Sequence, residues 1–322
     1  MIRPFIVAAS AAFVAASLAA QTPRSGIADS LLAAGNVNRA ESLYYAAVRQ
    51  RPRDPGARWA LGRYLAERGA VRVAVTLLEE ADQFGGDQVA PVVNADLAPM
   101  YIALGEYHQL LGLTHSPLTP AERERARWLE QHPTRLVAPD TIMGVGYTPS
   151  PDGTTIGHMP IRIQGRAVEA TIDAHARGLT LCDTASVVSR VRRFADAKQN
   201  AASSTPAPAA ADSIGVGRLT YTNFPLSVAP CAGQAVLGID VLSRLSPTFD
   251  PRARTIMLHV NGLDRSAGLP AGNELVTRMT NRDLLIARAG GWLASSDPTM
   301  ARMLGSRRWT LDGRRGTIRV EP

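Results

Sequence analysis

The sequence predicts a multidomain α + β chain, with an all-α segment first and an all-β segment after it. Over residues 25–130, small and large apolar residues return with helical spacing and with a longer period of 34 residues. From about residue 140 the apolar residues alternate, and Gly and Pro interrupt them. The chain has 322 residues, 45% of them hydrophobic, so it is long enough for two buried cores and is not wholly disordered.

The first 20 residues predict an export signal. Arg3 gives a positive start, the stretch from Phe5 to Leu18 is apolar, and the small residues Ala19 and Ala20 offer a cleavage site. An uncleaved membrane anchor is the alternative, although the stretch is short for one. No later apolar run approaches 20 residues, so no membrane span is expected after signal cleavage. We therefore expect a periplasmic or secreted protein.

Composition argues against nucleic-acid and metal binding. The chain has 35 basic and 28 acidic residues, a net charge of +7 spread thinly along the sequence, and only 5% aromatic residues. A nucleic-acid-binding protein would concentrate basic residues on one face and interleave aromatic ones. His108, His115 and His132 lack the spacing of metal ligands. The sequence therefore predicts no nucleic-acid partner, no metal and no cofactor.

Residues 25–130 are predicted to form helical hairpins. The repeated positions are Gly35, Ala40, Tyr44, Ala47 and Pro52, which return as Gly69, Ala74, Leu78, Ala81 and Gly86. Leu61-Gly62 returns as Leu104-Gly105 only after 43 residues, which indicates about nine inserted residues around Gly85 to Asn94. The pattern resembles tetratricopeptide repeats, and stacked repeats of this type usually bind peptides or proteins. A spacer that only packs on its neighbouring domain is the alternative.

The segment after residue 140 is predicted to form a small closed β-barrel or sandwich. His158–Ile163 and Ala167–Ile172 form a hairpin around Gln164-Gly165, and a further strand covers Gly178–Cys182. A short helix is predicted over Ala185–Val191, and the Ala-, Ser- and Pro-rich residues 195–212 predict a flexible loop. Further strands are predicted over Ile214–Leu219, Phe224–Val228 and Thr255–Val260. The segment Val236–Leu242 leads into a second short helix.

These elements resemble the retropepsin-like aspartyl proteases of bacteria over about residues 155–262. The resemblance rests on a strand that runs into Asp173, on the later segment with Leu237, Gly238 and Asp240, and on an Asp-Pro-Arg turn at 250–252. It implies a retropepsin-like domain over 140–262 with Asp173 as the catalytic Asp. Two such Asp residues share a proton and activate the water that attacks a peptide carbonyl. A single lobe supplies one Asp, so the resemblance also implies a homodimer.

The triplet at the implied active site is altered. The family has Asp-Thr-Gly, whereas this chain has Asp173, Ala174 and His175. Ala174 lacks the hydroxyl that hydrogen-bonds across the two loops in the family, and His175 stands where Gly lets the substrate backbone approach. The flap would fall in 195–212. Two hypotheses follow: a protein that binds peptides or proteins with impaired or lost peptidase activity, and an active aspartic endopeptidase that uses Asp173 in a homodimer.

Residues 263–322 repeat part of the barrel. The matching positions, 62 residues apart, are Leu242, Thr248, Asp250, Arg252, Thr255 and Ile256, and then Leu304, Thr310, Asp312, Arg314, Thr317 and Ile318. The tail is therefore either a reduced second lobe, with strands over Glu274–Met279 and Leu284–Ala289, or a cover for one edge of the barrel. A second lobe would make the chain a monomer with an internal two-fold, and Asp297 is the candidate for its acid.

The two cysteines both fall in the predicted barrel. In an oxidising compartment Cys182 and Cys231 could pair and close an interval of 48 residues, which is worth roughly 4 kcal/mol on the chain-entropy model. Two buried free thiols are the alternative.

Overall fold

The computed structural model describes residues 23–151, 153–194, 206–263, 273–280, 283–288, 291–295 and 297–321. The predicted export signal over residues 1–20 lies outside these ranges. Contacts divide the chain into two compact units, residues 1–118 with 287–292 and residues 119–286 with 293–322. We call them the helical unit and the barrel unit. Within the described ranges, no helix is both long enough and apolar enough to cross a membrane.

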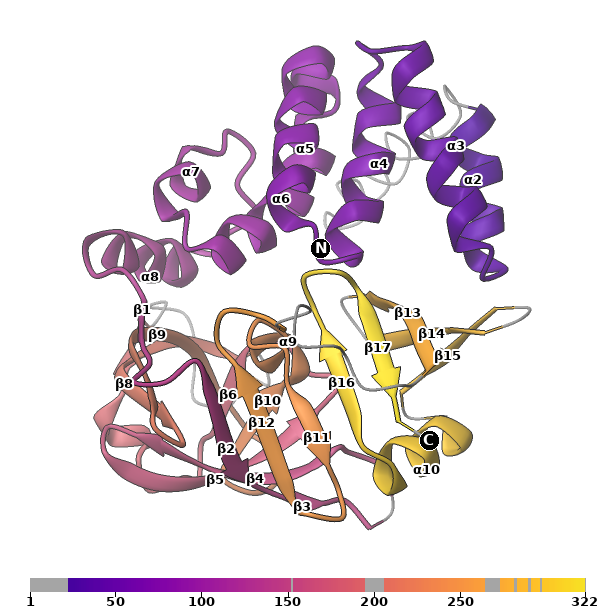
Figure 1. Ribbon diagram of the computed structural model, residues 1–322. Coiled ribbons are helices and arrows are strands. Elements are labelled where there is room, and N and C mark those ends of the chain that lie inside the picture. Colours follow the sequence, from indigo (N-terminus) through magenta and orange to yellow (C-terminus); the bar gives the residue numbers. More distant parts are fainter. Residues whose placement is uncertain are drawn as a thin grey trace, which may run out of the picture. The chain divides into compact units, whose positions relative to one another are not determined.

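The helical unit consists of consecutive antiparallel helices (Figure 1). They are α2 (Pro23–Ala33), α3 (Val37–Gln50), α4 (Pro55–Glu67), α5 (Val71–Gly85), α6 (Ala90–Leu104) and α7 (Tyr107–Gly112), with a 3-10 turn η1 (Gly86–Gln88) between α5 and α6. Turns between helices use glycine where the backbone enters the left-handed region, at Gly35 (φ +77°) and Gly69 (φ +84°). The predicted insertion around Gly85 to Asn94 forms η1 and the first turn of α6.

Small side chains let neighbouring helices of this unit pack closely. The residues of the 34-residue period are buried on equivalent faces: Ala40, Tyr44 and Ala47 on α3, and Ala74, Leu78 and Ala81 on α5. Gly62 lies on α4 opposite Leu78, where a Cβ atom would come within 3.0 Å of the leucine side chain. The period therefore reflects which residues face the core of the helical unit.

Helix α8 (Pro120–Gln131) belongs to the barrel unit, although the sequence groups it with the preceding helices. It begins with a capping box in which Thr119 and Glu122 bond each other's backbone N–H groups. Ala121 packs with Phe194 and Ala210 of the barrel. Arg125 Nη1 also donates to the Leu226 carbonyl at 3.0 Å.

The barrel unit contains two sheets, whose strands are spread along the whole C-terminal two-thirds of the chain. The strands of the first are β1 (Arg135–Val137), β3 (Thr148–Pro149), β4 (Gly157–Ile163), β5 (Arg166–Asp173), β6 (Leu179–Cys182), β7 (Arg192–Arg193), β8 (Ala207–Val216), β9 (Leu219–Ala229) and β10 (Ala235–Gly238). Their order is β1-β9-β6-β10-β5-β4-β8-β7, with β3 on β4. Because β8 pairs with both β4 and β9, this sheet closes into a barrel.

The second sheet joins two parts of the sequence. Its strands are β2 (Ile142–Gly146), β11 (Thr248–Asp250), β12 (Thr255–His259), β13 (Asn273–Met279), β14 (Leu284–Arg288), β15 (Gly291–Ala294), β16 (Trp309–Asp312) and β17 (Thr317–Val320). Their order is β15-β14-β13-β17-β16-β11-β12-β2. A short helix precedes β11, namely α9 (Ile239–Ser243), and a longer one precedes β16, namely α10 (Pro298–Ser306). The end of β14 and the start of β15 fall within residues 287–292, which group by their contacts with the helical unit. We call residues 142–259 the first lobe and residues 273–320 the second lobe.

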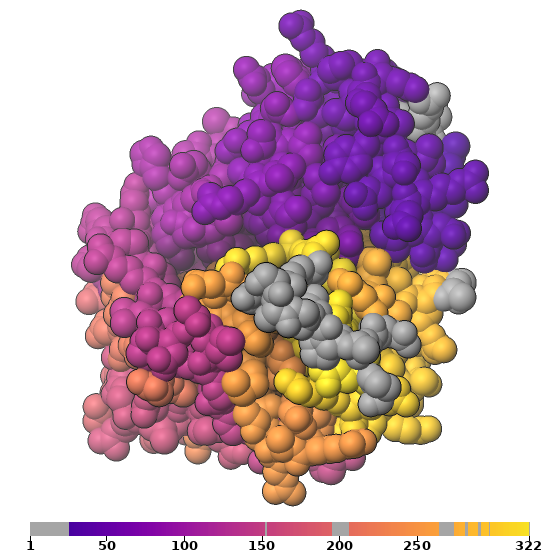
Figure 2. Space-filling model, in the orientation of Figure 1, coloured from indigo at the N-terminus to yellow at the C-terminus, as the bar shows by residue number. Residues whose placement is uncertain are grey.

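The two lobes meet at strands β11 and β16. Thr248 pairs with Thr310 and Phe249 with Trp309 in antiparallel register, and the two aromatic rings stack with centroids 4.0 Å apart. Figure 1 shows yellow β16 and β17 beside orange β11 and β12, and in Figure 2 these orange and yellow surfaces lie against each other. The tail therefore adds strands to the β11 edge of the first lobe.

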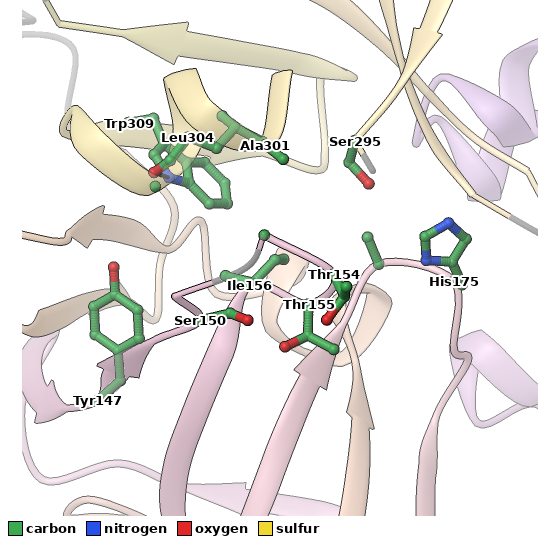
Figure 3. A pocket seen from close by; sticks show the side chains of 13 residues that line it. Tyr147, Ser150, Thr154, Thr155, Ile156, His175, Ser295, Ala301, Leu304 and Trp309 are labelled. Atoms are coloured by element: carbon green, nitrogen blue, oxygen red, sulfur yellow. Dashed lines mark hydrogen bonds between the residues drawn. The ribbon is translucent and has the colours of Figure 1, made fainter. Parts of the chain in front are cut away.

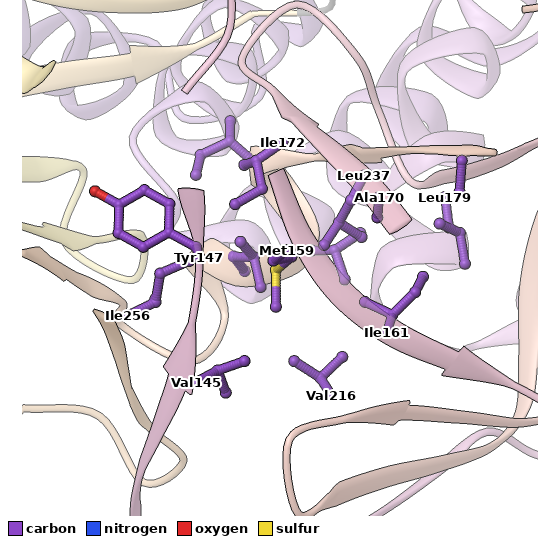
Figure 4. Close-up of a cluster of buried hydrophobic side chains, with 14 of the residues drawn as sticks. Val145, Tyr147, Met159, Ile161, Ala170, Ile172, Leu179, Val216, Leu237 and Ile256 are labelled. Atoms are coloured by element: carbon purple, nitrogen blue, oxygen red, sulfur yellow. The ribbon is translucent and has the colours of Figure 1, made fainter. Parts of the chain in front are cut away.

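A continuous apolar core fills the barrel unit. Alternate residues of β4 and β5 point into it, among them Met159, Ile161, Ala170 and Ile172, all at most 2% exposed (Figure 4). Cys182 at the end of β6 is bonded to Cys231 with a Cα–Cα distance of 5.0 Å. This disulfide ties β6 to the segment that precedes β10.

Three local predictions were wrong. The single strand predicted over Ile214–Leu219 comprises the end of β8, a turn at residues 217–218 and the start of β9. Residues 207–212, predicted as part of a flexible loop, belong to β8, because the small side chains of Ala209, Ala210 and Ala211 are fully buried and their backbone pairs with β9. The rest of that predicted loop, residues 195–205, lies outside the described ranges. The helix predicted over Ala185–Val191 is only the 3-10 turn η2 (Val188–Arg190).

Candidate functional site

Asp173 is the last residue of β5, a strand that is flanked by β10 on one side and β4 on the other. Strand β10 lies between β5 and β6, parallel to the first and antiparallel to the second, so that Gly238 pairs with Asp173. Leu237, 3% exposed, fixes this arrangement in the core. The carboxylate of Asp173 is 27% exposed and therefore reaches solvent from a rigid strand end.

Gly238 and Asp240 hold the loop that follows Asp173. A Cβ atom at Gly238 would stand 2.6 Å from the Ala176 carbonyl oxygen, so only glycine lets the two segments pass. The Gly238 N–H donates to the Gly178 carbonyl at 2.7 Å. In return, the Gly178 N–H donates to the Asp240 carboxylate at 2.9 Å. The Leu-Gly-Ile-Asp segment, residues 237–240, therefore holds the loop that follows Asp173 in place.

The imidazole of His175 lies between two carboxylates. Asp173 Oδ1 accepts the His175 backbone N–H at 2.8 Å and is 3.1 Å from His175 Nδ1. On the other side of the ring, Nε2 is 3.4 Å from Asp283 Oδ2. Each ring nitrogen therefore faces a carboxylate oxygen, one from each lobe.

Asp283 comes from the second lobe, and the sequence did not point to it. It directly precedes β14, and its N–H donates to Thr280 Oγ1 at 3.0 Å, while the Thr280 N–H donates to the Asp283 carbonyl at 3.0 Å. Its carboxylate is 15% exposed and also accepts from Ser295 Oγ at 3.2 Å. A threonine three residues before an aspartate, between two predicted strands, is the signal that could have found it.

Asp297, the acid that the sequence suggested for the second lobe, has a structural role instead. Its carboxylate accepts the Thr299 N–H at 2.9 Å and caps the N-terminus of α10. The aspartate follows β15 and precedes a helix, and this is the usual setting for a capping residue.

The Arg177 guanidinium interacts electrostatically with both acids. Its pKa is lowered by burial of the guanidinium, and the carboxylates of Asp240, Asp283 and Asp173 oppose that effect. The positive charge therefore remains in a partly buried position between the two lobes.

A cleft opens beside His175 (Figure 3). It has an empty volume of about 470 Å³ measured out to open solvent. Its lining residues are Tyr147, Ser150, Gly153, Thr154, Thr155, Ile156, Ala174, His175, Ser295, Ala301, Leu304, Gly305 and Trp309. Hydroxyl groups and His175 line one part and apolar side chains of α10 and Ile156 the other, a mixture that suits a peptide-like ligand. Among the described residues, no cluster of His, Cys, Asp and Glu could hold a metal ion.

Comparisons with known proteins give matches only among solved structures. No protein-family model and no curated protein matches the sequence. One similar structure is a retropepsin-like aspartic protease from Rickettsia conorii, with 16% identity and a TM-score of 0.27 over 39% of this chain and 91% of that one. Another is the retroviral protease-like domain of Ddi1 from Leishmania major, with 17% identity and a TM-score of 0.23 over 37% and 98%. The structural neighbours are thus retropepsin-like aspartic proteases.

Proposed function

We propose that this chain is an exported peptide-binding protein with a retropepsin-like barrel whose acid pair does not cleave. The observation that carries the proposal is the His175 ring between Asp173 and Asp283. Aspartic proteases need two carboxylates that share one proton and hold a water molecule between them. Here the His175 ring contacts both carboxylates, in the place where the proteases hold that water molecule.

The cleft beside His175 supports the binding part of the proposal. Its apolar wall can hold a side chain, while the hydroxyls of Ser150, Thr154 and Thr155 can bond a backbone in extended conformation. In this proposal Asp173, Ala174 and His175 are the counterparts of the family triplet, and they contribute recognition without hydrolysis.

The helical unit is proposed to be a tetratricopeptide-like module that binds a further peptide or protein segment. The 34-residue recurrence of buried small residues on α3 and α5 supports it.

A crosslinking experiment tests the helical unit. A photo-crosslinking residue at Val73, which is 54% exposed on α5, should capture the partner. The same group at Arg166, exposed at the hairpin end of β5, is the control.

Export is proposed from the apolar segment over residues 5–18. The bond between Cys182 and Cys231 suits an oxidising compartment. Amino-terminal sequencing of the mature protein tests this, and a start near Gln21 is expected.

The decisive experiment incubates the mature protein with unstructured peptides from about pH 3 to pH 7 and measures both binding and cleavage. We expect bound, intact peptides and weaker binding by Asp173→Asn. Asp183→Asn, which changes an exposed carboxylate near the end of β6, is the matched control. Cleavage that Asp173→Asn and a statine-type inhibitor both abolish would overturn the proposal in favour of an active endopeptidase. Absence of both binding and cleavage would also overturn it.

A further inference from the structure

The Arg177 guanidinium donates hydrogen bonds to backbone carbonyls of both lobes. Its Nη1 donates to the carbonyl oxygens of Ala174 at 3.1 Å and Ala176 at 2.8 Å, within the loop that follows Asp173. Its Nε donates to the Thr280 carbonyl at 2.9 Å, and its Nη2 donates to the Thr280 and Asp283 carbonyls, the latter at 3.2 Å. All five contacts are to backbone oxygens, three of them on Thr280 and Asp283 of the second lobe.

The carboxylate of Asp283 contacts His175. By bonding the Thr280 and Asp283 carbonyls, Arg177 therefore holds the backbone from which this carboxylate reaches the imidazole. Ala174 has only a methyl group at the position next to Asp173, so its side chain contributes no hydrogen bond between the lobes.

We propose that Arg177 is the positioning residue that holds Asp283 against His175. The guanidinium supplies the bonds across the two loops that the side chain of Ala174 cannot supply. The role of the assembled site in binding peptides rests on the proposed function, whereas the positioning role itself does not.

The geometry requires arginine. A guanidinium has five N–H donors in a planar fork, so it can bond the first-lobe carbonyls of Ala174 and Ala176 on one side and second-lobe carbonyls on the other. A lysine ammonium carries three donors on one atom and cannot span both sides. Arg177→Lys therefore keeps the charge near Asp240, Asp283 and Asp173 but loses the bridge.

The test follows the His175 ring by ¹⁵N NMR in histidine-labelled protein, with His175→Asn to assign its signals. Arg177→Ala and Arg177→Lys are compared with the parent at temperatures where each is folded. We expect both variants to shift the His175 Nε2 signal and to lower peptide affinity about tenfold or more. Arg162→Lys is the matched control, because Arg162 Nη2 also donates to a backbone carbonyl of the barrel unit, that of Gly217 at 2.8 Å.

A second variant separates positioning from general stability. Asp283→Asn should shift the His175 signal in the parent. In the Arg177→Lys background the same substitution should cause little further shift, because the Asp283 carboxylate no longer contacts His175 there. An equal Asp283→Asn shift in both backgrounds, or unchanged His175 signals in Arg177→Lys, would overturn the inference. These spectra need no peptide, so a protein that binds no peptide refutes the proposed function without deciding the role of Arg177.

Discussion

The hydroxyl oxygens of Thr248 and Thr310 lie 2.8 Å apart, on residues that are paired across β11 and β16 and separated by 62 positions in the sequence. The flanking strands keep the same offset, because Thr248 pairs with Met257 and Thr310 with Arg319. An approximate two-fold axis therefore passes between the two threonines. The second lobe repeats the last strands of the first, and the pair marks where the repeats join.

This threonine pair predicts a measurable coupling. Thr310→Val should lower the free energy of unfolding by about 1–2 kcal/mol, because it leaves the buried Thr248 hydroxyl without that partner. The double variant Thr248→Val/Thr310→Val should cost less than the sum of the two single changes. Urea unfolding measures all three. Thr255→Val, whose hydroxyl only bonds a nearby carbonyl at an exposed site, should change stability by less than about 0.5 kcal/mol.

The same junction predicts the oligomeric state. Strand β16 pairs with the edge of β11, so that this edge is not free to pair with a strand of a second chain. Sedimentation equilibrium of the mature protein should therefore give the mass of one chain at micromolar concentration. A two-chain mass that is lost on substitution of Thr248 would instead favour the homodimer that the family resemblance implies.

Much of this fold could be predicted from local sequence pattern. Helices followed by a β-barrel are confirmed, and the strand that runs into Asp173 was predicted because its apolar residues alternate and a Gly turn precedes it. The Ala-rich start of β8 could not be predicted, because its burial depends on the facing strand β9. Asp283 was missed for the same reason: its partner His175 is 108 positions away, and only tertiary pairing brings them together.

Gly238 predicts a steric effect at the site. Gly238→Ala places a Cβ atom 2.3 Å from Asp240 Oδ1 and 2.6 Å from the Ala176 carbonyl, so the loop or β10 must shift. We expect a loss of about 1–3 kcal/mol in unfolding free energy, measured in urea, together with weaker peptide binding. Gly26→Ala is the contrasting variant, since it lies in α2, away from the cleft, with no atom outside its own helix turn within 4 Å of the added carbon. It should stabilise the protein by about 0.5–1 kcal/mol.

The disulfide predicts a redox-dependent stability. Cys182 and Cys231 are 49 positions apart, so reduction should lower the free energy of unfolding by about 4 kcal/mol on the chain-entropy model. Urea midpoints with and without dithiothreitol measure the difference. The Cys182→Ala/Cys231→Ala variant should match the reduced protein and should not respond to the reductant. A reductant effect of equal size in that variant would show that the bond is not its cause.

His259, beside the two-fold junction, predicts a pH dependence of stability. Burial and then the Arg308 guanidinium lower the pKa of its imidazole in the folded chain, and its Nε2 lies 3.4 Å from Thr248 Oγ1. An unfolded histidine has a pKa near 6.5, so the unfolded chain takes up the proton first as the pH falls. Stability should therefore decline below about pH 6.5 and level off only below the folded-state pKa.

Urea unfolding between about pH 8 and pH 5 measures this decline, and His259→Gln should reduce its slope because glutamine does not titrate. His132→Gln, at an exposed position after α8, should leave the slope as in the parent. If the dependence of unfolding free energy on pH is unchanged in His259→Gln, another titrating group causes the decline at low pH. A reduced slope would show that protonation next to Thr248 weakens the junction of the two lobes, because the imidazolium must either lose its buried position or face the Arg308 charge.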